Sequence, residues 1–266
     1  MNKITFDKLH GLGNDYIYID LDKYPLADIA QFARQYSDRR KGIGGDGVIT
    51  YNREPSGHYK MRIFNLDGSE GLMCGNAIRC VAKLLYEREL DRSNPMTIET
   101  QSGDKILALT IEGGKVLAAR VDMGLPRLLD AGKEVQGIEG SYVSVGNPHF
   151  IHFIESDPDD YPLADIGPRI EHDPAFPDGV NYEVAQIKDP HTIKMRVWER
   201  GSGLTQACGT GATATAVAAI ALGLVAHKVQ VEMPGGALII EWSGKESDPV
   251  YMTGPATYVY QGIVTI

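Results

Sequence analysis

Hydrophobic and polar positions alternate over many short stretches of the chain. Runs rich in β-branched and aromatic residues, bounded by Gly, Pro or Asp, predict strands. These runs are 16–20, 47–51, 59–65, 96–100, 106–112, 116–122, 140–145, 149–154, 182–188, 192–199, 228–233, 237–242 and 249–260. Apolar residues at 26, 29, 30 and 33 have a helical spacing and predict a helix over 26–37. Helices are also predicted over 75–87 and 209–222, so the pattern indicates a β-rich α/β protein.

The least polar part of the chain is 201–226, which carries no charged residue. Its purely apolar segment, 216–226, is too short to cross a bilayer and predicts a buried core helix. The first residues show neither the apolar run nor the cleavage site of a secretory signal. We therefore expect a cytoplasmic protein without a membrane partner.

Composition narrows the function classes. A chain of 266 residues accommodates one large domain or two of moderate size. Lys and Arg number 26 against 35 Asp and Glu, a net charge of -9, which argues against a nucleic-acid partner. Three cysteines in a chain of this length are not a disulfide framework and indicate a reducing compartment.

The sequence repeats itself at an offset of 134 residues. The run Lys-Met-Arg-Ile-Phe at 60–64 corresponds to Lys-Met-Arg-Val-Trp at 194–198. Carried forward without gaps, the offset places Cys74 on Cys208 and Gly75 on Gly209. Because this offset is about half the chain, we infer two related halves, each with a strand, a Gly-rich loop, Cys-Gly and a helix.

A cysteine at a helix N-terminus meets free backbone N–H groups and the positive end of the helix dipole. Both favour the thiolate, so we expect a lowered pKa for Cys74 and Cys208. The same amides bind carboxylates. Pseudo-twofold halves are expected to face equivalent thiols across one cleft, where one removes an α-proton and the other protonates the opposite face. Cys80 corresponds to Ala214 and is interpreted as a packing residue.

The segment Gly42–Gly47 matches the pattern G-x-G-x-x-G. A dinucleotide site needs a strand before this pattern and a helix after it. Here charged residues precede it and a strand-like run follows, so we expect a glycine turn that enters a strand.

Nine segments in order resemble the diaminopimelate epimerase family of cofactor-independent racemases and epimerases. They are 8–15, 42–47, 64–70, 74–80, 146–149, 179–181, 199–201, 207–212 and 233–236. The one notable departure is Ala77, where the family usually has Gly, and Ala suits a first helical turn.

The resemblance implies two pseudo-symmetric α/β domains, each a β-sheet or barrel wrapped around a central helix. It implies a first domain of 1–118, carrying Cys74 and completed by the tail 255–266, and a second of 119–254, carrying Cys208. It further implies a homodimer that interconverts LL- and meso-diaminopimelate in lysine and peptidoglycan precursor biosynthesis. No pyridoxal phosphate, other cofactor or metal is expected.

The resemblance also implies the site residues. Cys74 and Cys208 would be the two acid/base groups, and the Gly75-Asn76 and Gly209-Thr210 amides would bind the reacting carboxylate. His149 and Glu199 would line the site beside the thiols, with Glu199 also near substrate. The side chains that hold substrate would be Asn14, Asn65, Asn147, Asn181 and Arg200. Arg200 favours a two-headed substrate, because guanidinium binds a distal carboxylate bidentately.

Three alternatives remain open at the level of sequence. A racemase of the same fold acting on histidine or proline would not need Arg200. Thiol redox exchange usually employs C-x-x-C, whereas Cys74 and Cys80 are six residues apart. A non-catalytic binding module would not require a thiol in both halves.

Overall fold

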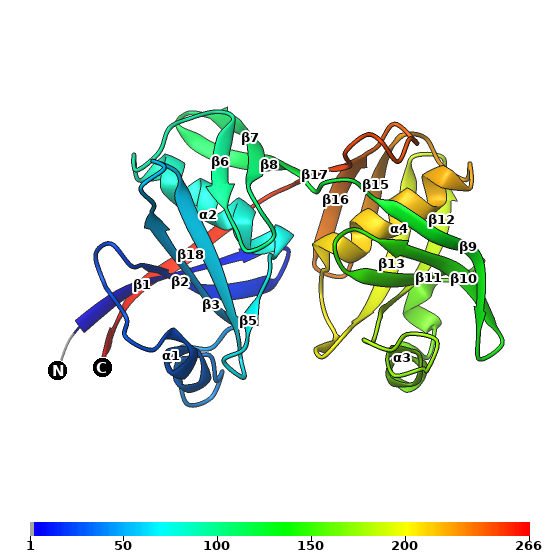
Figure 1. Ribbon diagram of the computed structural model, residues 1–266, viewed down its shortest axis with the longest axis horizontal. Coiled ribbons are helices and arrows are strands. Elements are labelled where there is room, and N and C mark those ends of the chain that lie inside the picture. Colours follow the sequence, from blue (N-terminus) through cyan, green and yellow to red (C-terminus); the bar gives the residue numbers. More distant parts are fainter. Residues whose placement is uncertain (1–2) are drawn as a thin grey trace. The chain divides into compact units, whose positions relative to one another are not determined.

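The chain forms two α/β units in the computed structural model, which describes residues 3–266. The N-terminal unit runs as far as Val121 and also includes Gly254–Ile266, and the C-terminal unit is Asp122–Thr253. Each unit combines a multistranded sheet with one long helix that lies among its strands, α2 in the first and α4 in the second (Figure 1).

The N-terminal unit contains eight main strands, one short strand and two helices. They are β1 (Lys3–Gly11), β2 (Asn14–Asp20), α1 (Ile29–Tyr36), β3 (Gly47–Arg53), β4 (Tyr59–Asn65), β5 (Glu70–Gly71), α2 (Gly75–Glu87), β6 (Met96–Glu99), β7 (Lys105–Glu112), β8 (Lys115–Asp122) and β18 (Thr257–Thr265). The strands pair in the order β18, β1, β2, β3, β4, β6, β7, β8, and the pairs β2/β3 and β4/β6 are parallel.

The C-terminal unit has the same composition of elements. They are β9 (Arg127–Val135), β10 (Ile138–Ser144), β11 (Pro148–Phe153), a 3-10 turn η1 (Pro158–Asp160), α3 (Leu163–Glu171), β12 (Asn181–Asp189), β13 (Thr192–Glu199), β14 (Gly203–Leu204), α4 (Gly209–Ala221), β15 (Lys228–Met233), β16 (Gly236–Glu241) and β17 (Tyr251–Gly254). The pairing order is β9, β10, β11, β12, β13, β15, β16, β17, with β11/β12 and β13/β15 parallel.

The two sheets therefore share one topology, parallel at equivalent pairs and antiparallel elsewhere. The offset of 134 residues relates Gly75–Glu87 to Gly209–Ala221, and it relates the start of α1 to the start of α3. The predicted pseudo-symmetry of two β-rich α/β domains is confirmed at the level of strand order and helix position.

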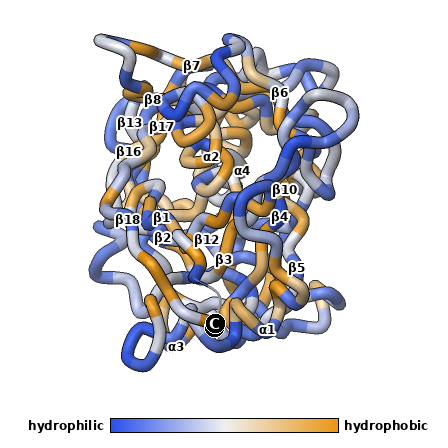
Figure 2. Tube along the Cα trace, turned by 90° about the vertical axis from the view of Figure 1, so that its left-hand side faces the viewer, coloured by the Kyte–Doolittle hydropathy of each residue, from blue (hydrophilic) through white to orange (hydrophobic). Residues whose placement is uncertain are grey.

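The central helices are buried because their residues are small and apolar. Nearly all residues of α4 are buried, and seven of its thirteen positions are Ala or Thr that let the surrounding strands approach. Hydrophobic residues also line α2 and α4 in Figure 2. Both helices match the predicted buried helices. In the described part of the chain, no helix is long and apolar enough to span a membrane.

Three predicted elements need correction. The single strand expected over 249–260 is interrupted at Pro255, which has no N–H for a sheet ladder, so β17 and β18 are separate. Strands β1 and β9 were not predicted; most of β9 is exposed, so its pattern of apolar residues is weak. Helix α3 was also not predicted, because Pro168 lies inside it.

Candidate active site

Cys74 stands directly before α2, as its N-cap. Its backbone is extended, with φ -134° and ψ 117°, and its side chain makes no cap hydrogen bond. The thiol is half-buried. Gly75 and Asn76 form the first turn, where backbone N–H groups have no partner within the helix. Cys74 and the residues around it in the N-terminal unit are called the Cys74 site below.

Two of the predicted asparagines meet at the Cys74 site. The Cys74 thiol donates to Asn14 Oδ1 at 3.4 Å, and Asn76 Nδ2 donates to the same oxygen at 3.2 Å. Asn14 Nδ2 donates to Asp46 Oδ2 at 2.8 Å, which fixes the orientation of its amide. Asp46 belongs to the glycine turn 42–47, which leads into β3 as expected, so this turn supports the site without binding a nucleotide motif.

Arg79 lies beneath the N-terminus of α2 and is fully buried. It donates to the Gly75 carbonyl at 2.9 Å, to Asn76 Oδ1 at 3.0 Å and to the Pro255 carbonyl at 3.1 Å. Burial lowers the pKa of its guanidinium. Gly11 makes room for it, since a Cβ there would lie 3.0 Å from Arg79 Nη2. Sequence reasoning assigned no role to this residue.

Asn65 lies at the end of β4 with an exposed side chain. Its amide donates to Ser69 Oγ at 3.0 Å, across the turn that leads to β5. In its present orientation the Asn65 amide thus stabilises that turn.

Cys208 is the N-cap of α4, in the same extended conformation as its counterpart. Its sulfur accepts from the Gly211 N–H at 3.4 Å and lies 3.5 Å from Thr210 Oγ1. The residue is only 4% exposed. Gly209 forms the first helical position, and its carbonyl accepts from Thr213 Oγ1 as the Gly75 carbonyl accepts from Arg79. Cys208 and its neighbours in the C-terminal unit are called the Cys208 site.

The expected lowering of the Cys208 pKa is wrong. Burial raises the pKa of this thiol well above its usual value, and the nearby Glu199 and Glu183 raise it further. The Thr210 hydroxyl and the Gly211 amide act in the opposite direction but do not compensate. The helix terminus is thus present, but desolvation and two carboxyl groups outweigh it.

His149 is fully buried and bonded through both ring nitrogens. Nδ1 lies 2.7 Å from Glu183 Oε1, and Nε2 lies 3.0 Å from Asn147 Oδ1. Asn147 Nδ2 in turn donates to Thr210 Oγ1 at 3.4 Å. The structure therefore brings Asn147, His149 and Thr210 together beside Cys208, together with Glu183, which sequence reasoning missed.

Glu199 ends β13 and is half-buried. Burial raises the pKa of its carboxyl group, whereas hydrogen bonding from Thr205 and the neighbouring Cys208 lower it. Its Oε1 accepts from the Thr205 hydroxyl. Glu199 is therefore a neighbour of the Cys208 thiol, as predicted from the resemblance.

Asn181 and Glu171 hold the loop that carries Arg200. Asn181 Oδ1 accepts from the Arg200 N–H at 2.9 Å, and Asn181 Nδ2 donates to the Pro148 carbonyl at 3.0 Å. Glu171, at the end of α3, accepts from the Gly201 N–H and from Trp198 Nε1, each at 2.7 Å. The exposed Arg200 side chain donates to the Asp178 carbonyl at 2.7 Å, so its guanidinium is held at the surface of this loop.

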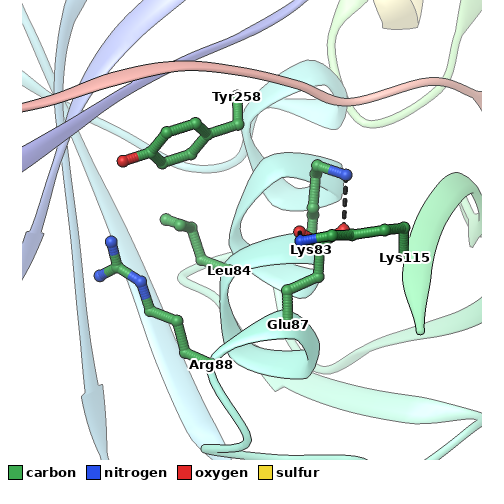
Figure 3. A pocket seen from close by; sticks show the side chains of 6 residues that line it. All are labelled: Lys83, Leu84, Glu87, Arg88, Lys115 and Tyr258. Carbon is green, nitrogen blue, oxygen red and sulfur yellow. Dashed lines mark hydrogen bonds and ion pairs between the residues drawn. The ribbon is translucent and has the colours of Figure 1, made fainter. Parts of the chain in front are cut away.

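The detected cavities lie elsewhere. One of about 220 Å³ is lined by Lys83, Glu87, Arg88, Lys115, Leu84 and Tyr258 (Figure 3). It adjoins the C-terminal end of α2, whose thirteen residues separate it from Cys74 by about 20 Å. Its cations already have partners: Lys83 and Lys115 pair with Glu87, and Arg88 pairs with the buried Asp7. We assign it no role in the chemistry.

Solved structures identify the class of fold. A phenazine biosynthesis protein of the PhzF family from Bacillus anthracis superposes with a TM-score of 0.77 and 17% identity, and 100% of both chains is covered. A hydroxyproline epimerase from Agrobacterium vitis superposes with a TM-score of 0.70 and 14% identity, over 99% of this chain and 91% of the other. The chain therefore has the two-unit fold of these proteins.

Sequence comparison then identifies the family. The family model described as diaminopimelate epimerase matches residues 6–129 and 141–259. A protein of Bacteroides thetaiotaomicron named diaminopimelate epimerase is 49% identical over 263 residues, covering 98% of this chain and 97% of the relative. The chain belongs to the diaminopimelate epimerase family.

Proposed function

We propose that this protein is an epimerase that interconverts LL- and meso-diaminopimelate, with Cys74 and Cys208 as the two acid/base groups. The observation that carries the proposal is the cysteine at the start of the buried helix in each unit, at equivalent positions of the repeat. Family membership supports the substrate, since relatives that match over nearly their whole length bear this name.

The reaction needs no redox step. One thiolate takes the α-proton, so a C–H bond breaks, an S–H bond forms, and the electron pair moves into the carboxylate as an enediolate. The other thiol then gives its proton to the opposite face of the same carbon, leaving a thiolate. The centre is inverted, and the two sulfurs have exchanged their protonation states. One substrate must therefore contact both sulfurs.

The helix termini stabilise the intermediate in this mechanism. The N–H groups of Gly75, Asn76, Gly209 and Thr210 are the donors for the reacting carboxylate, where negative charge accumulates. Donors that are already oriented need not reorganise during proton transfer. Arg79 adds a buried positive charge beneath the first of these two helix termini.

Arg200 is the residue proposed to bind the distal carboxylate, with Asn65 and Asn181. Its exposed guanidinium has donors free in number to form a bidentate pair, and its loop is held from behind by Asn181. His149, Asn147 and Glu199 are proposed to orient the Cys208 side of the substrate.

A homodimer and a cytoplasmic location complete the proposal. Strand β18 pairs with β1 yet exposes large apolar side chains, with Val259 51% and Ile263 67% exposed. An exposed apolar strand of this kind is a template for pairing with a second copy. Free thiols with acid/base roles require a reducing compartment.

Incubation of LL-diaminopimelate with the reduced protein in heavy water tests the function. We expect deuterium at one α-carbon of the product together with inversion, without added pyridoxal phosphate. Histidine and proline serve as competing substrates and should exchange far more slowly. No exchange with diaminopimelate would overturn the proposal, and faster exchange with proline or histidine would overturn the substrate assignment.

A further inference from the structure

A buried carboxyl group stands behind the Cys208 site with no role in the mechanism above. Glu183 lies on β12, next to β11, and both its side chain and that of His149 are fully buried. The Gly211 position permits its close approach. A Cβ at 211 would lie 2.7 Å from Glu183 Oε1 and 3.3 Å from Cys208 Sγ.

A continuous hydrogen-bond chain joins this carboxyl group to the sulfur. It runs from Glu183 Oε1 to His149 Nδ1, from His149 Nε2 to Asn147 Oδ1, and from Asn147 Nδ2 to Thr210 Oγ1. The last link joins Thr210 Oγ1 and Cys208 Sγ. Every member belongs to the C-terminal unit.

Counting protons fixes the direction of the chain. Asn147 Oδ1 only accepts, so His149 Nε2 must carry a proton. Two facing lone pairs at 2.7 Å would repel, so a second proton must lie between Nδ1 and Oε1, on either atom. Asn147 Nδ2 donates to the Thr210 oxygen, which leaves the Thr210 hydroxyl hydrogen for the sulfur.

We propose that Glu183 is a positioning residue for Cys208. By keeping a proton in its hydrogen bond to His149, it holds Nε2 as a donor and directs the whole chain so that the Thr210 hydroxyl donates to the sulfur. That donation stabilises the thiolate form of Cys208. The inference rests on the acid/base role proposed above for this thiol.

The surroundings of Glu183 favour the retained proton. Within residues 3–266 its Oε2 has no hydrogen-bond partner, and a bare carboxylate oxygen in a dry interior is unfavourable. Burial also raises the pKa of this carboxyl group, against a smaller opposite effect of His149. The other titratable groups around it are Glu199 and Cys208, both of which disfavour a further negative charge.

Loss of this proton would reverse the chain. His149 would then donate from Nδ1 to the carboxylate and need a donor at Nε2. The Asn147 amide would have to turn over, its oxygen would accept from the Thr210 hydroxyl, and the sulfur would lose that donor. Cys208 would then be held in the thiol form.

Two substitutions separate this role from simple packing. Glu183→Gln presents an amide N–H to His149 Nδ1 and keeps the direction of the chain, whereas Glu183→Leu is of similar size and leaves Nδ1 without a partner. The readout is alkylation of Cys208 by iodoacetamide against pH, followed by peptide mass spectrometry, with the Cys74 peptide of the same sample as internal control.

We expect Glu183→Leu to raise the midpoint of Cys208 alkylation by about one pH unit, the effect of one hydrogen bond to a charged group. It should lower kcat by about tenfold with a smaller change in KM. Glu183→Gln should restore both values toward wild type. Equal shifts in the two variants, or no shift in Glu183→Leu, would overturn the proposal.

A second measurement applies to the wild-type protein, so folding of the variants is not essential. Nitrogen-15 NMR of labelled histidine, with His149→Gln for assignment, should show a protonated Nε2 between about pH 6 and pH 8, where free histidine titrates. An unprotonated Nε2 would overturn the inference. Neither readout requires turnover, so absence of epimerase activity would contradict the proposed function separately.

Discussion

The two thiols differ in the charges that surround them. Beneath Cys74 lies Arg79, a buried cation bonded to Gly75 and Asn76. Its counterpart in the repeat is Thr213, which has no charge. Beside Cys208 lie Glu183 and Glu199 instead. A helix N-terminus alone would treat both sulfurs alike, so these side chains make the pseudo-symmetric pair chemically unequal.

Removal of either N-cap thiol should abolish inversion. Cys74→Ala and Cys208→Ala each delete one acid/base group, so the rate should fall by at least about 10²-fold in each variant. Cys80→Ala is the matched control, because Cys80 is fully buried on α2 and faces packing neighbours. The assay is the rate of LL to meso conversion. An inactive Cys80→Ala variant that is still folded would contradict the assignment.

Cys80 should instead report on stability at high pH. Burial raises the pKa of this thiol from 9.0 to about 11. The unfolded chain releases the proton first, so stability present below pH 9 is lost as pH rises toward 11. Between these values, wild type should lose about 2 kcal/mol more unfolding free energy than Cys80→Ala. Urea unfolding across this range measures it, and parallel curves would refute it.

The residues that sequence reasoning missed were charged groups inside apolar patterns. Arg79 follows Ala77 and Ile78 on a helix that is otherwise buried, and Glu183 stands between Tyr182 and Val184 on a buried strand. A charge at such a position signals a buried polar network. The identity of its partner could not be predicted, because His149 and Glu183 meet only after β11 and β12 pair in register.

At the scale of elements, α3 shows how the repeat carries more information than local pattern. Pro168 and Gly167 disguise this helix in the sequence. The start of α1 plus 134 residues nevertheless gives Leu163, where α3 begins. Gly167 also has a packing reason, since a Cβ there would lie 2.4 Å from the Trp198 ring. Most strands within one unit were predictable, whereas the mostly exposed β9 lacked a pattern.

The end of α3 should influence substrate affinity through the Arg200 loop. Glu171 holds Gly201 and Trp198 on either side of Arg200. Glu171→Ala frees this loop, so KM for diaminopimelate should rise by about tenfold while kcat changes less. Glu112→Ala, at an exposed position on β7, is the control. Steady-state kinetics measure both, and a fall in kcat alone would contradict the positioning of Arg200 by Glu171.

At the scale of the whole molecule, the exposed face of β18 leads to a prediction about assembly. Ile263→Asp places a charge in the proposed contact between two copies and should weaken dimerisation by at least about tenfold. Leu117→Asp makes the same change at an exposed position on β8 and serves as control. Sedimentation velocity measures the mass. A wild-type monomer, or equal effects of both substitutions, would contradict a dimer through β18.

The order of the whole chain was accessible from sequence because two copies of one unit share their helix starts. The offset that joins Cys74 to Cys208 also joins the two sheets in strand order. The ionisation of the thiols was not accessible, since the pKa of Cys208 depends on burial and on carboxyl groups from other strands. Local sequence near a helix N-terminus contains neither term.

The central claim is that two groups, one on each face of the α-carbon, carry the proton exchange. The most direct test follows LL-diaminopimelate in heavy water at early conversion and analyses the label in both isomers. Two thiols predict meso product with deuterium at the inverted carbon, while recovered LL substrate remains nearly unlabelled. Equal labelling of recovered substrate and product, as expected of a single base, would contradict the account.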